Sequence, residues 1–260
     1  MVFDYFDLLS GEPIPYHDVG HLRSPMIKEL FPSSGIGLEA YNFYLNLLAW
    51  DKEKLLKYGE AVYPKIIDKL RQNERLNAFD IATLLPSTRS FYKEVFEFFM
   101  VENVVWHDKP RKYVAYTTDD DGQHITGEIN RDNFDRVRHA MLQLNFISLD
   151  NDEAKEPVHT SEHAKELWDK AQGFLKAQKD NSTHEDRPEL NMGNIISKLC
   201  ATNIGYNYFN VFQLTVFQLY DAFFQYSFLR SADLNENIFS NHGGDKFKFE
   251  DWTKPILRQV

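Results

Sequence analysis

Cysteine and long apolar runs are scarce in this sequence of 260 residues. The single cysteine, Cys200, cannot form an internal disulfide, which excludes the small secreted scaffolds that disulfides hold together. No stretch reaches the roughly 18 uninterrupted apolar residues of a membrane-spanning helix. Asp4 and Asp7 stand where a signal peptide would carry basic residues. We therefore expect a protein of a reducing cytoplasm that has no membrane partner.

Positive charge is also in short supply. Lysine and arginine together number 29 against 39 for aspartate and glutamate, so the formal net charge is −10. A protein that binds duplex nucleic acid usually concentrates positive charge to displace phosphate counterions. Hydrophobic residues make up 43 % and charged residues 26 % of the chain, close to the average for soluble globular proteins. We therefore expect a globular protein that does not bind nucleic acid.

Apolar side chains recur at helical spacing over most of the chain from residue 37 onward. Leu38, Tyr41, Leu45 and Leu48, for example, fall at intervals of three and four. The same spacing predicts helices at 38–48, 52–71 with a kink or division at Pro64, 78–85, 91–99, 134–144, 160–175, 190–201 and 211–229.

Residues 101–130 are instead rich in side chains that favour β-structure. Val104–Trp106 and Tyr113–Tyr116 form two short runs, and turn-forming residues separate them and follow the second run. This pattern predicts a small antiparallel hairpin or three-stranded sheet. The expected fold class is therefore mainly α with a small antiparallel β insertion (α+β), in a multi-helix globular domain.

We divide the chain into an N-terminal arm, residues 1–34, and a helical domain, residues 35–260. The arm contains four prolines and few periodic apolar positions, which predicts an ordered but irregular course with one helical turn at Met26–Leu30. The polar stretch 177–189 predicts a loop, and the alternating segment 245–256 an edge strand or a docked strap. Because the C-terminal helices are so apolar, we expect them to pack back on the N-terminal ones as one composite domain.

One segment fits the pattern H-x-x-E-H of inverted zinc peptidases, with His159, Glu162 and His163. That chemistry requires both histidines one turn apart on a continuous helix. Pro157 and a helix cap at Thr160 place His159 before the helix begins, so the two imidazoles would diverge. Two surface histidines beside a helix start are the favoured interpretation, and a metal-dependent hydrolase is the alternative.

A second segment has the spacing of a calcium loop, with Thr117, Asp119, Asp121, Gly122 and Glu128 at ligand or turn positions. Threonine at the first position removes a formal charge, and the preceding residues favour a strand rather than an entering helix. A hairpin turn accounts for the Asp-Asp-Gly sequence without a metal, because aspartate and glycine tolerate the backbone angles of a tight turn.

No other motif indicates catalysis. Gly35 and Gly37 precede a helix, where backbone amides can bind an anion, but the segment lacks the third glycine of a dinucleotide fingerprint and the lysine of a P-loop. Cys200 lies in an apolar helical context that normally buries a thiol inertly. We therefore predict no enzymatic activity, no catalytic residue, no bound metal and no cofactor.

The most prominent feature is an aromatic helix near the C-terminus. A narrow polar seam of Gln218, Asp221 and Gln225 interrupts an otherwise apolar circumference. The apolar positions are Phe212, Leu214, Val216, Phe217, Leu219, Tyr220, Phe223, Phe224 and Phe228. A helix of this kind must be covered on most sides. It is either a central core helix or a helix whose aromatic surface partly contacts another protein.

Two segments resemble a known family. Phe212–Asp221, followed by Phe223 and Phe224, is similar to a segment near the C-termini of tail assembly chaperones and related tail-module proteins of siphophages that infect Gram-positive bacteria. The arm Pro13–Leu30 is similar to the start of larger proteins of that group; its matching residues are Val19–Pro25 and Lys28–Leu30.

The resemblance implies a non-catalytic protein that coats the aggregation-prone tape-measure protein and assists assembly of the tail tube in the host cytoplasm. Its implied partners are the tape-measure and tail-tube proteins, with possible self-association. The acidic composition is consistent with such a role. The alternatives are a structural component of the virion and a phage protein that contacts host defence machinery.

Overall fold

The computed structural model describes residues 3–62, 64–147, 191–202 and 205–242. The predicted helix at 160–175, the predicted loop at 177–189 and the segment 245–256 lie outside these residues, as do His159, Glu162 and His163. The fold is α+β, as the sequence predicts, with helices around two small antiparallel sheets.

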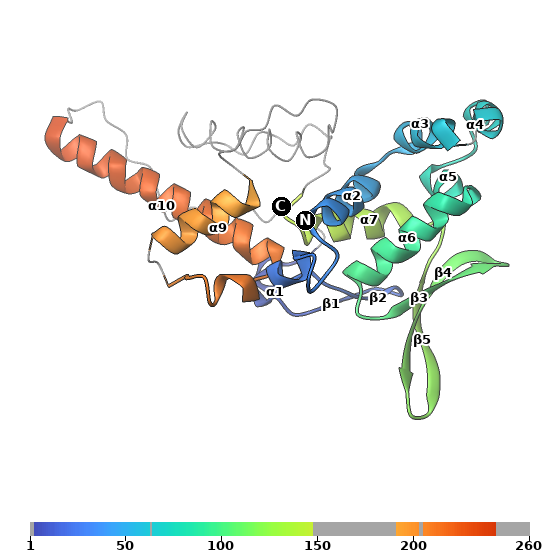
Figure 1. Ribbon diagram of the computed structural model, residues 1–260, viewed down its shortest axis with the longest axis horizontal. Helices are drawn as coiled ribbons and strands as arrows, with labels where there is room; N and C mark the ends of the chain where they lie inside the picture. Colours follow the sequence, from blue (N-terminus) through green and yellow to red (C-terminus); the bar gives the residue numbers. More distant parts are fainter. Residues whose placement is uncertain (1–2, 63, 148–190, 203–204, 243–260) are drawn as a thin grey trace.

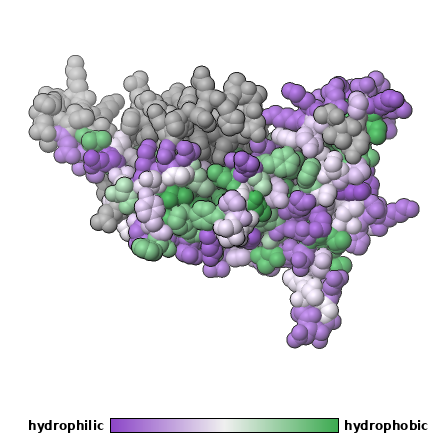
Figure 2. Space-filling model, in the orientation of Figure 1, coloured by the Kyte–Doolittle hydropathy of each residue, from purple (hydrophilic) through white to green (hydrophobic). Residues whose placement is uncertain are grey.

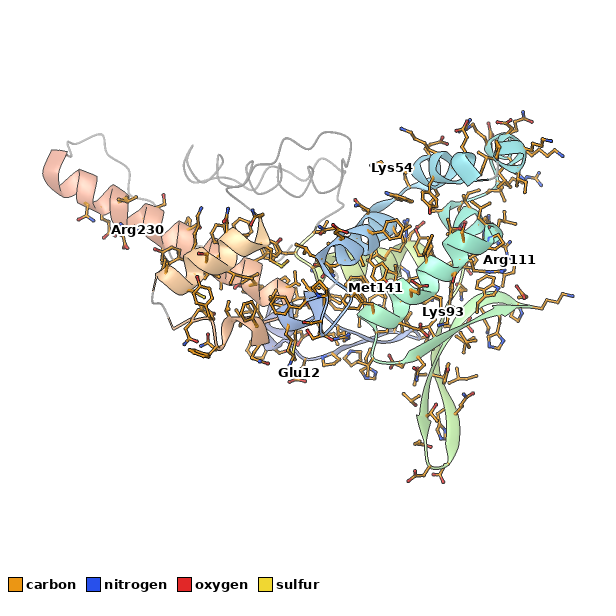
Figure 3. The ribbon with its side chains drawn as sticks, viewed as in Figure 1. Glu12, Lys54, Lys93, Arg111, Met141 and Arg230 are labelled. Carbon is orange, nitrogen blue, oxygen red and sulfur yellow. The ribbon has the colours of Figure 1, made fainter. Side chains whose placement is uncertain are left out.

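The body of the fold is a set of packed helices between residues 38 and 143 (Figure 1). They are α2 (Leu38–Ala49), α3 (Lys52–Val62), α4 (Pro64–Arg71), α5 (Ala78–Leu84), α6 (Pro86–Phe99) and α7 (Phe134–Gln143). Pro64 divides the predicted helix 52–71, and both Pro64 and Pro86 stand at the first helical position, where the missing N–H costs nothing. Met141 of α7 is fully buried near the middle of the molecule (Figure 3).

Arg138 of α7 ties two of these helices together. Its buried guanidinium donates to the carbonyls of Leu48, at 3.1 Å, and of Trp50, at the end of α2. It also donates to Asp135 and lies over the ring of Phe134. Because the last carbonyls of a helix have no partner within the helix, this side chain satisfies acceptors that α2 leaves open.

The β insertion is a three-stranded antiparallel sheet in the order β3–β4–β5. The strands are β3 (Asn103–Asp108), β4 (Arg111–Asp119) and β5 (Gly122–Ile129). The β4–β5 hairpin projects from the body (Figure 1), and its turn lies at Asp119–Gly122, where the sequence predicts one.

The prediction that the arm is irregular is wrong for much of its length. The arm contains α1 (Tyr5–Ser10) and a short antiparallel hairpin of β1 (Ile14–Tyr16) and β2 (Gly20–Leu22). The predicted turn of helix is present as a 3₁₀ helix, η1 (Ile27–Leu30). Pro15 belongs to β1, because this two-stranded sheet has only edge strands and an edge strand tolerates proline.

The arm is bonded to the body through its backbone. The amide of Val101 donates to the carbonyl of His21 at 3.1 Å, and that of Arg23 to the carbonyl of Phe99 at 2.9 Å. The amide of Glu128 in β5 donates to the carbonyl of Asp18 at 2.8 Å. These bonds place the arm against the sheet and the end of α6, so it is part of the folded unit.

The C-terminal part consists of α9 (Met192–Ala201), a 3₁₀ turn η3 (Val211–Gln213) and the long helix α10 (Val216–His242). The aromatic helix therefore begins at Val216 rather than at 211 and continues past 229. Thr215 and Gln218 form a capping box at its start: the Thr215 amide donates to the Gln218 side chain, and the Gln218 amide to the Thr215 hydroxyl.

Candidate functional site

The two segments that the sequence singles out, the arm and the start of the aromatic helix, contact each other directly. The amide of Ile27 donates to the carbonyl of Leu214, and the amide of Val216 donates to the carbonyl of Pro25, both at 2.9 Å. Met26 forms an isolated antiparallel bridge across this junction. The arm thus lies between the body and α10 (Figure 1), and α10 contacts both the arm and α9.

Most of the apolar residues predicted at this helix lie in the core. Val216, Phe217, Leu219, Tyr220 and Phe223 are buried. The half-buried ones are Phe212, Leu214, Phe224 and Phe228. The first turns of α10 are therefore part of the core. At both ends of the predicted segment 211–229, the apolar side chains are only half-buried.

Phe146, which follows α7, connects this helix to the body. Its ring centroid lies 5.3 Å from that of Phe217 and 5.2 Å from that of Phe224. Phe146 has a φ of 63°, in the left-handed position that usually takes glycine at a helix C-terminus. The ring contacts explain why phenylalanine occupies this position in place of glycine.

The polar seam of α10 faces α1. The Tyr5 hydroxyl donates to the Asp221 carboxylate at 2.7 Å, and the Gln218 amide donates to the carbonyl of Leu9 at 2.8 Å. The Gln225 amide lies 3.3 Å from the Tyr5 hydroxyl. Burial raises the pKa of Asp221, although hydrogen bonds from Tyr5 and Gln225 oppose the shift. Burial and the nearby Asp221 raise the pKa of Tyr5 to about 12.

Asp221→Asn is expected to stabilise the fold at neutral pH. The carboxyl pKa is raised in the folded state, so wild-type stability falls as the pH rises from the ordinary value of 3.8 through the raised pKa. Asparagine cannot ionise, yet it keeps an acceptor for Tyr5. The gain should shrink as the pH is lowered through the raised pKa. Urea denaturation of both proteins between roughly pH 4 and pH 7 measures it, and a variant that is less stable at neutral pH would contradict it.

Between α9 and α10 a hydrogen-bonded turn exposes an aromatic ring. The Asn207 side chain accepts from the amides of Phe209 and Asn210, and the Asn210 side chain accepts from the amide of Asn207 and donates to the carbonyl of Gly205. Phe209 at the tip is 94 % exposed, and Tyr208 beside it is also exposed. A ring held in water by a turn whose own polar groups are satisfied has no role in the core and is available for contact.

A second pair of rings joins the arm to the segment that precedes α10. Phe212 contacts the exposed Phe31 of the arm, with ring centroids 5.0 Å apart. We call Phe31, Tyr208, Phe209 and Phe212 the aromatic patch. The hydrophobic residues visible over α1, α9 and α10 in Figure 2 show that apolar surface gathers in this part of the molecule.

A groove runs along α10. It is an open depression of about 440 Å³. Its apolar lining consists of Leu9, Tyr206, Leu214, Ala222, Tyr226 and Leu229. The polar seam residues Gln218, Asp221 and Gln225 lie along it. Neither the groove nor the patch is visible in the sequence, because both depend on how the arm and the segment 205–214 lie against α10.

Within the described residues, the side chains weighed as calcium ligands are not brought together. Asp119 and Asp121 lie at the β4–β5 turn, where Asp119 contacts His124, whereas Glu128 lies far along β5 and pairs with Lys112. The Lys112 hydrogen bond lowers the pKa of Glu128. Within the described residues no three histidine, cysteine, aspartate or glutamate side chains cluster as a metal site.

In the glycine segment before α2, two amides are already bonded within the chain. The amide of Gly35 donates to the carbonyl of Phe31 at 2.8 Å, and that of Ile36 to the carbonyl of Glu29 at 3.2 Å. A side chain at Gly35 would collide with the Glu29 backbone, which explains the glycine by packing. Cys200 is half-buried, and burial raises the pKa of its thiol, so it is a poor nucleophile.

Among the helices of the described residues, none has the length and hydropathy needed to cross a membrane.

Part of the chain matches a known family model. A family model described as the YomV second domain matches residues 178–256, a stretch that includes α9 and α10 but less than half of the chain. No curated protein and no solved structure matches the chain. The C-terminal part, which carries the aromatic helix, the groove and most of the aromatic patch, is thus similar to the YomV second domain, and this similarity indicates a phage-associated protein.

Proposed function

We propose that the chain is a non-catalytic phage tail assembly chaperone. It binds apolar helical segments of the tape-measure protein and assists assembly of the tail tube in the host cytoplasm. The observation that carries the proposal is the aromatic patch, where Phe209 is 94 % exposed on a turn fixed by reciprocal asparagine hydrogen bonds. Rigid aromatic side chains bury a large area and lose little entropy on binding, which suits a protein contact.

The charge of the chain supports the same proposal. A protein that covers an aggregation-prone partner must itself remain soluble, and a net charge of −10 favours solubility. The similarity of residues 178–256 to a phage-associated domain supports the setting. The resemblance of Phe212–Asp221 to tail assembly chaperones and related tail-module proteins, and of the arm to larger proteins of that group, supports the specific role.

Phe209→Ala is expected to weaken binding to a tape-measure fragment without changing the melting temperature. Truncation of a central aromatic contact typically costs about 2 kcal/mol, or roughly a 30-fold increase in Kd. The matched control is Ile125→Ala, since Ile125 is equally apolar, 76 % exposed and located on β5. Titration calorimetry of both variants with the fragment makes the comparison. Equal affinities for the two variants would reject the aromatic patch as the contact surface.

The protein composition of finished virions distinguishes an assembly chaperone from a structural component of the virion. An assembly chaperone leaves the particle, so the chain should be absent from purified virions. Its presence in stoichiometric amounts would contradict the proposal and establish a structural component.

A further inference from the structure

The groove along α10 is long enough to accommodate about three turns of a helix. Its α10 lining residues Gln218, Ala222, Gln225 and Leu229 repeat at intervals of four, three and four, so they form one face of the helix. From Gln218 to Leu229 this face extends about 16 Å, or three helical turns. Leu9 of α1 and Tyr206 form the opposing walls. A groove between elements, with apolar walls and this length, suits an amphipathic helix.

The groove is lined by a carboxylate that has no counter-charge among the described residues. Asp221 is only 8 % exposed and lines the groove. Its polar neighbours, the Tyr5 hydroxyl and the Gln225 amide, are both neutral. Across the part of the chain that the structure describes, no lysine, arginine or histidine forms an ion pair with it.

A buried charge that lacks a partner of opposite sign costs free energy. An apolar groove that contains one buried negative charge is complementary to a helix whose apolar stripe contains one positive charge. A wholly apolar helix would seal the carboxylate away from water and raise that cost. A helix with a glutamate or aspartate at this place would add repulsion.

We propose that the groove receives a single amphipathic helix of the partner protein, and that one lysine or arginine within its apolar stripe pairs with Asp221. The inference rests on the proposed function only in taking the tape-measure protein as the source of that helix. It adds the chemistry by which the site selects among the many apolar helices that such a long protein offers.

Selection from a peptide library tests the charge preference without assuming the partner. The probe is a displayed library of 14-residue amphipathic helices whose central stripe position varies among Leu, Lys, Arg, Gln and Glu. The full chain and its Asp221→Asn variant serve as baits. We expect enrichment of Lys or Arg on the wild-type chain and none on the variant. The Kd of an enriched peptide should rise roughly 30-fold on the variant. No enrichment, no retained peptide, or equal Kd values would overturn the inference.

Two further variants control for folding and location. Asp233→Asn removes an exposed carboxylate from the same helix and should leave the Kd unchanged. Leu229→Arg changes an exposed residue that lines the groove, so it should weaken binding while the melting temperature stays constant. An unchanged Kd for the Leu229→Arg variant would show that the peptide binds outside the groove and would overturn the inference.

The same assay with overlapping tape-measure peptides tests the proposed function separately. Enrichment of basic residues from the library, with no tape-measure peptide bound, would uphold the groove and reject the tape-measure protein as its partner. Sedimentation of the chain alone tests whether a second copy of the chain occupies the groove. A dimer that Asp221→Asn dissociates would assign the groove to a second copy and overturn the partner assignment.

Discussion

Replacement of Phe223 by alanine is expected to destabilise the fold by about 3–5 kcal/mol, the cost of removing a large ring from a packed core. The Phe223 side chain is only 7 % exposed and contacts Phe224 edge to face, with ring centroids 5.6 Å apart. It lies at the part of α10 that joins the core, so the cavity would form where the helix meets the rest of the molecule.

Chemical denaturation with the Phe209→Ala variant as the matched control measures this effect. Both changes remove one phenyl ring from the C-terminal part, but Phe209 is exposed and its loss should leave the free energy of unfolding nearly unchanged. Similar unfolding free energies for the two variants would show that Phe223 is not a core residue.

Arg138→Met is expected to cost about 2–4 kcal/mol, because it leaves one buried and one partly buried carbonyl acceptor without their donor. The side chain has no substitute: its guanidinium reaches Leu48, Trp50 and Asp135 at once. Methionine keeps much of the apolar stem but none of the donors. Lysine has a compact ammonium in place of the planar fork, so Arg138→Lys should recover only part of the loss.

Thermal or urea denaturation compares Arg138→Met with Arg136→Met, an exposed arginine on the same helix. The control should change the unfolding free energy by less than about 0.5 kcal/mol. Equal effects of the two substitutions would show that Arg138 does not hold α2 and α7 together.

Local sequence signals predicted the elements of the body well. Helical spacing placed α2, α5 and α7 within one residue at each end, but α6 begins five residues before its predicted start. Pro64 marked the division between α3 and α4. The turn residues Asp119–Gly122 placed the hairpin. In each case the signal and the structure that it specifies lie within the same few residues.

The arm was mispredicted because its order comes from distant partners. Three-residue strands such as β1 and β2 carry almost no periodicity, and their geometry depends on backbone bonds to Phe99, Val101 and Glu128. Proline content alone suggested an irregular course, but an edge strand accepts Pro15.

The candidate site was found only in part for the same reason. The polar seam of Gln218, Asp221 and Gln225 is evident from the sequence, yet its partner α1 lies more than two hundred residues away along the chain. The exposure of Phe209 depends on the reciprocal bonds of Asn207 and Asn210, and the pattern N-x-x-N is too common to predict it.

Co-expression with a fragment of the tape-measure protein tests most directly whether the apolar surface beside α10 contacts another polypeptide. The fragment should be insoluble alone, and it should become soluble and co-purify when the wild-type chain is present but not when the Phe209→Ala variant replaces it. An insoluble fragment in the presence of the folded wild-type chain, with no complex recovered, would contradict the proposed function.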